Sequence, residues 1–152
     1  MPFVAAVSLN AEGHPLYAKM APVPGFTRKA IGDWAKADLS PGCRVSSDGL
    51  ACFAGVADAG CQHQPPVVGA RKPRDLPTFK WINTIVGNLK TRFGGAYHAF
   101  DFAKYAHRYL AEFQYRFNRR FDMKSILSRL LHALVVAPPS PEHWLRAAEV
   151  SR

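Results

Sequence analysis

One predicted helix carries a polar stripe whose residue types suit chemistry on a phosphodiester. Within Trp81–Lys90, the residues Asn83, Gly87 and Lys90 recur at positions i, i+4 and i+7. At ~100° per residue, Lys90 returns to within about 20° of Asn83 and lies roughly 10 Å further along the helix axis. An amide oxygen that can bind a metal ion, a glycine and a cation together suit a surface that receives a phosphodiester. A core helix whose polar face is only solvated is the simpler interpretation of the same spacing.

The opposite face of this helix predicts how it is held in place. Its apolar residues follow the spacing of an amphipathic helix, and the helix is predicted to continue to Tyr97 and His98. The apolar stripe consists of Trp81, Ile82, Ile85, Val86, Leu89 and Phe93.

Asp48 is a second candidate ligand, and it comes at the end of a predicted strand, Cys43–Gly49. Open α/β sheets place ligand-binding groups at the carboxyl ends of strands, where the chain turns into the next element. A plain Asp-Gly turn accounts for Asp48 and Gly49 equally well. The sequence leaves both interpretations open at this position.

Positive charge is concentrated in the middle and second half of the chain. The 152 residues have a net charge of +9 and a pI near 9.8, and between Arg71 and Arg120 eleven Lys and Arg residues stand against three acidic ones. Clustered positive charge is typical of proteins that bind nucleic acids, although a solvated face has the same composition. The connector Gly69–Phe79 is basic and punctuated by proline, and it lies where it could touch a polyanion. The aromatic residues and arginines between Phe93 and Phe121 could stack bases, but their helical spacing favours a core role.

The composition argues against several other classes of protein. A hydrophobic content of 48% argues against disorder, and the length suits one domain with its own core. The cysteines Cys43, Cys52 and Cys61 contain no C-x-x-C pair, which predicts reduced thiols instead of a disulfide framework or a zinc site. Neither a leader-like start nor an apolar run of about 18 residues is present, so secretion and membrane spanning are not expected.

Periodicity and turn residues predict an α/β chain that forms a single domain, 1–152. A hairpin opens the chain, a helix capped by Thr27 follows, and the C-terminal third is helical, with Asp122 as the predicted cap of its middle helix. In order, the other predicted elements are the strands Phe3–Leu9 and Pro15–Val23, the helix Thr27–Leu39, the helix Leu50–Ala59, the strand His63–Val68, and the helices Phe100–Phe117, Ser125–Val136 and Glu142–Val150.

Several motifs in a fixed order carry a resemblance to a known family. They are Asp48-Gly49, Asn83-x6-Lys90, Gly95-Ala-Tyr97-His98 and Tyr109-Leu110-x-Glu112-Phe113-x-x-Arg116-Phe117-Asn118-Arg119-Arg120, with 34 residues between Asp48 and Asn83. This pattern closely resembles the C-terminal half of bacterial insertion-sequence transposases, in the ISXO-like group of the DDE superfamily. The resemblance runs from Phe3 to Val150, with 1–98 as the catalytic core and 99–152 as a C-terminal helical extension.

The resemblance implies an RNase H-like α/β fold, in which helices flank a mixed five-stranded sheet. It also implies two-metal phosphoryl transfer on DNA, with Mg²⁺ or Mn²⁺ as the cofactor. By this resemblance Asp48 and Asn83 are the catalytic and metal-binding residues, with Asn83 at the family's third acidic position. Lys90 is the residue expected to contact DNA near the reacting phosphate. The rest of the implied DNA-binding set is Arg92, His98, Arg116, Arg119 and Arg120.

The sequence departs from the family pattern at its beginning. The family's first catalytic aspartate lies on a strand before the one at Phe3–Leu9, and no acidic residue occurs here before Glu12. In the RNase H-like order this first strand is central, so its loss would leave strand edges unpaired. We therefore expect an N-terminally truncated transposase, or one with a misassigned start codon, that is inactive alone.

Two functions of different classes follow from these observations. The first is a fragment of a DNA transposase, with insertion-sequence ends and target DNA as partners, alongside copies of itself or an intact transposase. The second is a non-catalytic, basic DNA-binding module or an inhibitor of intact transposase. Both functions place the protein in the bacterial cytoplasm, associated with the nucleoid.

Overall fold

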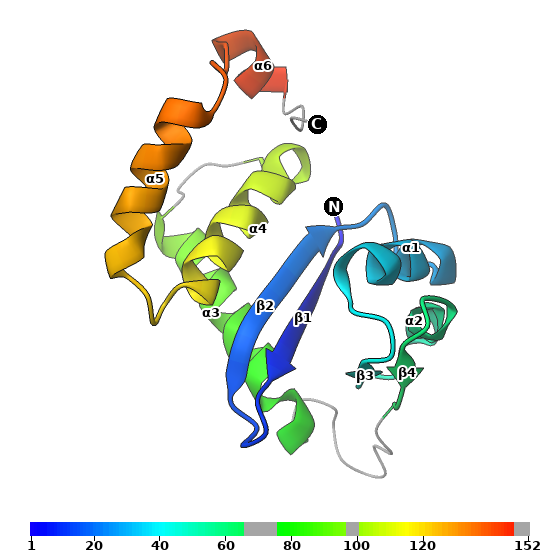
Figure 1. Ribbon diagram of the computed structural model, residues 1–152. Coiled ribbons are helices and arrows are strands. Elements are labelled where there is room, and N and C mark those ends of the chain that lie inside the picture. Colours follow the sequence, from blue (N-terminus) through cyan, green and yellow to red (C-terminus); the bar gives the residue numbers. More distant parts are fainter. Residues whose placement is uncertain (66–75, 97–100, 148–152) are drawn as a thin grey trace.

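A β-hairpin lies between two groups of helices in the computed structural model, which describes residues 1–65, 76–96 and 101–147 (Figure 1). Over these residues the fold is mixed α/β, with short 3-10 turns at Ala51–Ala54 and Pro77–Phe79. Its strands and helices are β1 (Phe3–Leu9), β2 (Pro15–Pro22), α1 (Arg28–Asp38), β3 (Arg44–Val45), α2 (Gly55–Asp58), β4 (Gln62–His63), α3 (Lys80–Ala96), α4 (Phe102–Asn118), α5 (Lys124–Val136) and α6 (Glu142–Ala147).

The hairpin predicted at the start of the chain is confirmed. β1 and β2 pair antiparallel, and the turn between them is closed by a hydrogen bond of 2.7 Å from His14 N to Asn10 Oδ1. Gly13 in this turn has a φ of +79°, a conformation that side chains rarely tolerate.

Alternate residues of β1 enter two separate hydrophobic cores, as expected for a strand that is covered on both faces. One face contributes Val4 and Ala6 to a core with α1 and α2. The other face contributes Phe3, Ala5 and Val7 to a core with α3 and α4. The buried residues of the first core are Val4, Val23, Ile31, Trp34, Ala35, Val56 and Cys61, and those of the second are Met20, Ile85, Leu89, Leu110 and Phe113.

Side chains of α4 cover the outer edge of β2. Asn118 accepts a hydrogen bond from Ala18 N at 2.7 Å and donates one to Ala18 O at 2.9 Å, while Gln114 Oε1 accepts one from Met20 N at 2.7 Å. One helical turn separates Gln114 from Asn118, so both amides reach the same strand edge. These contacts replace the hydrogen bonds that a neighbouring strand would make.

No described side chain covers the outer edge of β1 in this way. The main-chain hydrogen-bonding groups of Ala18 and Met20 point away from β1. In an antiparallel pair, the main-chain groups of their register partners, Val7 and Ala5, therefore point away from β2. Among the described residues, the main-chain N–H and C=O groups of Ala5 and Val7 have no hydrogen-bond partner. Within the described residues, the hairpin therefore has one covered edge and one open edge.

Helix α1 begins where the sequence predicts, because Thr27 Oγ1 accepts a hydrogen bond from Ala30 N at 3.2 Å. It packs closely on the segment predicted as one helix at Leu50–Ala59, which forms a 3-10 turn followed by α2. At this contact a Cβ on Gly55 would lie 2.2 Å from Arg28 O, so only glycine fits. Arg28 and Asp58 also form a two-pronged ion pair with hydrogen bonds of 2.7 and 2.8 Å.

The strand predicted at Cys43–Gly49 is much shorter in the structure. Only Arg44 and Val45 pair, parallel to Gln62 and His63, and the described residues form two separate two-stranded sheets. Just after Val45, the Ser46 hydroxyl donates a hydrogen bond to the main-chain oxygen of Gln64, the residue that follows β4. This oxygen is therefore taken by a side chain instead of a main-chain N–H of the neighbouring strand. The prediction of a strand at His63–Val68 extends past residue 65, outside the described residues.

The C-terminal helices lie close to their predicted positions. Helix α5 begins after Met123 without a side-chain cap, and the expected cap Asp122 instead accepts a hydrogen bond from the Ser125 hydroxyl. Helix α6 is joined to α4 by bonds from Tyr105 and Arg108 to main-chain oxygens. The last residues of the helix predicted at Glu142–Val150 lie outside the described residues. Over residues 1–65, 76–96 and 101–147, no helix is both long enough and apolar enough to cross a membrane.

Candidate nucleic-acid interface

Helix α3 has the two unlike faces that its sequence predicts. Ile85 and Leu89 are buried against the hairpin, while Asn83 and Lys90 are exposed. The start of the helix is fastened to the hairpin turn, because Trp81 Nε1 donates a hydrogen bond of 2.7 Å to Gly13 O. The buried apolar face and this hydrogen bond fix the orientation of α3, so that its polar stripe, Asn83, Gly87 and Lys90, faces outward.

Gly87 leaves an unobstructed strip between Asn83 and Lys90. A Cβ built on Gly87 would meet no atom within 4 Å, so no packing within the described protein requires a glycine there. In the middle of an exposed helix a glycine costs about 1 kcal/mol relative to alanine. The strip is therefore open to close approach by another molecule's backbone.

Arg92 and Arg116 lie together around one carboxylate, Glu112. Arg92 forms hydrogen bonds of 2.7 and 3.1 Å with the two oxygens of Glu112, and Arg116 Nη1 lies 3.4 Å from Oε1. The pair between Arg92 and Glu112 joins α3 to α4. Part of the charge predicted to grip DNA is thus neutralised, and Arg92 also holds two helices together.

Arg120 serves mainly to anchor α4 to the hairpin. Its guanidinium donates to the main-chain oxygens of Pro15, Leu16 and Phe117 and lies over the rings of Phe117 and Phe121. Burial lowers the pKa of Arg120. A phosphate that bound Arg120 would have to share the guanidinium with these oxygens.

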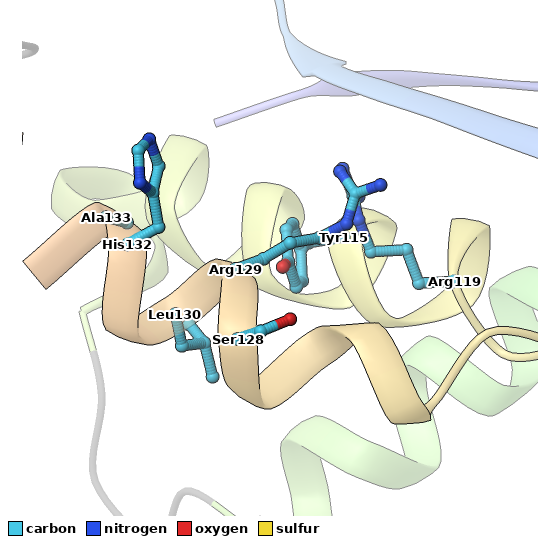
Figure 2. A pocket seen from close by; sticks show the side chains of 7 residues that line it. All are labelled: Tyr115, Arg119, Ser128, Arg129, Leu130, His132 and Ala133. Carbon is cyan, nitrogen blue, oxygen red and sulfur yellow. The ribbon is translucent and has the colours of Figure 1, made fainter.

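Arg119 lies at a basic cavity between α4 and α5. Its guanidinium lies 3.9 Å from the centre of the Tyr115 ring, a geometry suited to a cation–π contact. The cavity has a volume of about 500 Å³, and Figure 2 shows Arg129 and His132 reaching it from α5. His98, the remaining member of the predicted DNA-binding set, lies outside the described residues.

Asp48 follows β3 and is exposed. Its Oδ1 accepts a hydrogen bond of 3.3 Å from Leu50 N, and Gly49 has a φ of +86°, so the local geometry is that of an Asp-Gly turn. Among the described residues, no three His, Cys, Asp or Glu side chains gather closely enough to hold a metal ion. Because no such group forms around Asp48, the described residues do not by themselves fit a pair of divalent metal ions.

The sequence reasoning missed a polar pair next to Asp48. Ser47 is buried, and its Oγ lies 2.9 Å from His63 Nε2 in a hydrogen bond whose direction depends on the tautomer of the ring. Parallel pairing of β3 with β4 brings the two residues together. Both strands were predicted, but not their register, which is the information needed to find this pair.

A comparison with family models identifies the class of protein: a transposase of the DDE type. The chain belongs to the family of ISXO2-like transposase domains, whose model matches residues 1–118. No curated protein and no solved structure matches the chain.

The matched range extends from β1 to the end of α4. It includes Asp48, the whole of α3 with Asn83 and Lys90, and the cluster of Arg92 and Arg116. Arg119, Arg120 and the helices α5 and α6 lie beyond it. Membership of this family implies a DNA substrate and the use of a divalent metal ion.

Proposed function

We propose that this chain is part of the catalytic domain of a DNA transposase that joins DNA strands at insertion-sequence ends by phosphoryl transfer. The observation that carries the proposal is the family match over residues 1–118. In this proposal the polar stripe of α3 lies along the DNA, with Lys90 beside a phosphate and Gly87 allowing the backbone to come close. Asp48 and Asn83 are the candidate ligands for Mg²⁺ or Mn²⁺, and the place of action is the bacterial nucleoid.

The 152-residue chain alone is proposed to bind DNA without joining strands. Among the described residues, no group of three or more His, Cys, Asp or Glu side chains, at Asp48 or elsewhere, could hold a metal ion. The open edge of β1, with the unpaired main-chain groups of Ala5 and Val7, is where a further strand of an RNase H-like sheet would pair. A strand at this edge that carried a carboxylate would complete both the sheet and the metal site.

A basic DNA-binding module, or an inhibitor that competes with intact transposase, is the second candidate function. The net charge of +9 supports it, as does the exposed Lys90 on a helix whose fold does not depend on it. This function needs the same DNA surface but no metal site. The two candidate functions predict different results once a further strand with a carboxylate is added at the edge of β1. A transposase fragment should then gain metal-dependent DNA strand joining that Asp48→Ala removes, whereas a DNA-binding module should not.

DNA binding by α3 is tested by titrating a fluorescent duplex with the chain at several salt concentrations. We expect the affinity to fall steeply between about 50 and 200 mM salt, because Lys and Arg side chains release counterions from the phosphates. Lys90→Ala should weaken binding and lower the slope of log K against log salt by about one. Lys29→Ala is the matched control, since Lys29 is also exposed but lies on α1, on the other side of the hairpin. Equal losses for the two variants would contradict the assignment of the α3 surface.

A further inference from the structure

Helix α5 exposes its most apolar side. None of its residues is buried, and Leu127, Leu130, Leu131 and Leu134 are 67%, 50%, 55% and 76% exposed. A surface helix of a free monomer normally turns such a stripe toward the core. In Figure 1 α5 is the outermost helix beside α4.

The side of α5 that faces α4 is its polar side. Ser128, Arg129, Leu130, His132 and Ala133 line the basic cavity against α4, so Leu130 lies at the border between the two sides of the helix (Figure 2). Leu127, Leu131 and Leu134 do not line this cavity. The apolar side also has a regular pattern, because Met123, Leu127, Leu130 and Leu134 follow each other at spacings of four, three and four residues. That is the spacing of the a and d positions in a coiled coil.

The exposed apolar area is large enough for a specific interface. Phe121 and Met123 extend the leucine side at its start, and Val135 extends it at its end. Together these exposed side chains present on the order of 800 Å², above the ~300–600 Å² of the largest patch on a typical monomer and close to the ~800 Å² that each partner contributes to a standard interface.

We propose that the leucine side of α5 binds the same side of α5 in a second copy of this chain, with the two helices antiparallel. A two-fold axis near Leu130 and Leu131 places Leu127 opposite Leu134 of the second copy. The same axis places Lys124 beside the end of the other α5, at Ala137 of the second copy. The interface is self-complementary, as a two-fold dimer requires.

Charge favours the antiparallel arrangement over the alternatives. Helix α5 has no basic residue in its last turn, so its C-terminal carbonyls lack a cation from their own helix. Lys124 of the second copy supplies that cation in an antiparallel pair, whereas a parallel pair sets Lys124 against its own copy. Ile126, Leu131 and Ala133, which flank the seam, carry no charge that would repel a second copy.

This inference does not rest on the proposed function. Helix α5 begins after the matched residues 1–118, so the dimer face belongs to a part of the chain that the family model does not cover. A monomer that binds DNA would contradict the dimer and leave the transposase proposal standing. A dimer that does not bind DNA would support the dimer and contradict the proposed function.

Sedimentation equilibrium on the full chain tests the proposal over a range of about 1–200 µM. We expect the average mass to rise from that of one chain to that of two. Leu127→Glu should raise the dimer dissociation constant more than about tenfold, because it buries a carboxylate against a leucine. Val136→Glu is the matched control: Val136 is 66% exposed, against 67% for Leu127, and lies on the opposite side of the same helix.

A second variant tests the direction of the helices. Adding Leu134→Lys to Leu127→Glu should restore dimerisation, because an antiparallel pair sets each new carboxylate against a new ammonium. Far-ultraviolet circular dichroism checks that every variant keeps its helix content. A chain that stays monomeric throughout this range would overturn the proposal, whether the face binds a different protein, a lipid surface or nothing. A dimer that Leu127→Glu leaves intact would also overturn the proposal. Failure of the double variant to restore dimerisation would overturn the antiparallel pairing.

Discussion

The two edges of the β1–β2 hairpin differ in what covers them. The edge of β2 is covered by Asn118 and Gln114 of α4, whose amides take the place of a neighbouring strand. The edge of β1 has main-chain groups at Ala5 and Val7 that no described residue meets. In the part of the chain that the structure describes, the edge that faces α4 is thus complete, and the opposite edge is open.

The largest effect on stability is expected when a side chain is removed from the core beneath α4, the helix that covers β2. Leu110 is fully buried in the core that α4 shares with Met20 of β2, so Leu110→Ala should lower the free energy of unfolding by about 2–5 kcal/mol. Leu9→Ala is the control, because Leu9 lies on β1 and is 45% exposed, and it should cost less than about 1 kcal/mol. Urea denaturation measures both. Similar losses would mean that α4 is not what stabilises the covered edge.

The next largest loss of stability is expected when the side-chain amide of Asn118, which covers the edge of β2, is removed. Asn118→Ala leaves Ala18 N and Ala18 O unpaired in a partly buried position and should cost about 1–3 kcal/mol. Hydrogen exchange should become faster at Ala18 and stay unchanged at Ala5, which is already open. Asn88→Ala, at an exposed position on α3, is the control and should change neither quantity. Slow exchange at Ala5 in the unmodified chain would show that the edge of β1 is covered after all.

A smaller effect of opposite sign is expected at Gly87. Gly87→Ala should raise the stability by about 0.5–1 kcal/mol, because the position is helical, exposed and free of contacts. The same substitution should weaken DNA binding if the DNA backbone approaches α3 at this point. Gly95→Ala is the matched control, since Gly95 is also in α3 with open space around it but lies about 120° around the helix from Asn83, off the stripe of Asn83 and Lys90. An unchanged affinity for Gly87→Ala would remove Gly87 from the proposed DNA surface.

The smallest effect is a pH dependence carried by His107 on α4. Burial, and then the charge of Arg108, lower the pKa of His107, so the unfolded chain binds this proton more readily than the folded one. The stability should therefore fall as the pH drops below the unfolded value of about 6.5, until it passes the folded pKa. His107→Gln should remove this part of the pH dependence, whereas His143→Gln, at an exposed position on α6, should not. Urea midpoints at several pH values measure it, and equal profiles for His107→Gln and the unmodified chain would contradict it.

The covered half of the fold was predictable from the sequence, and the reason is local. The hairpin, the cap at Thr27 and the two faces of α3 and α4 all follow from alternation, capping or helical spacing within a few residues. The contacts that cover β2 were not predictable, because Asn118 and Ala18 are one hundred residues apart. Side-chain amides have no sequence pattern that marks such a partner.

The open half of the fold was predicted less well. The strands near Asp48 are two residues long where longer ones were predicted, because strand propensity does not fix register or where a ladder ends. The sequence also assigned Arg92, Arg116 and Arg120 to DNA without showing their protein partners. Glu112 and the main-chain oxygens near Pro15 meet these guanidinium groups only in the folded chain.

We propose that this chain of the ISXO2-like transposase family binds DNA through α3 and does not join strands by itself. One agarose gel tests both parts: supercoiled plasmid is incubated with the chain at low salt, with and without Mn²⁺. We expect retarded plasmid that remains supercoiled in both lanes, with less retardation for Lys90→Ala. Plasmid that is not retarded at any protein concentration would contradict the DNA surface, and Mn²⁺-dependent nicking that Asp48→Ala abolishes would contradict the incomplete metal site.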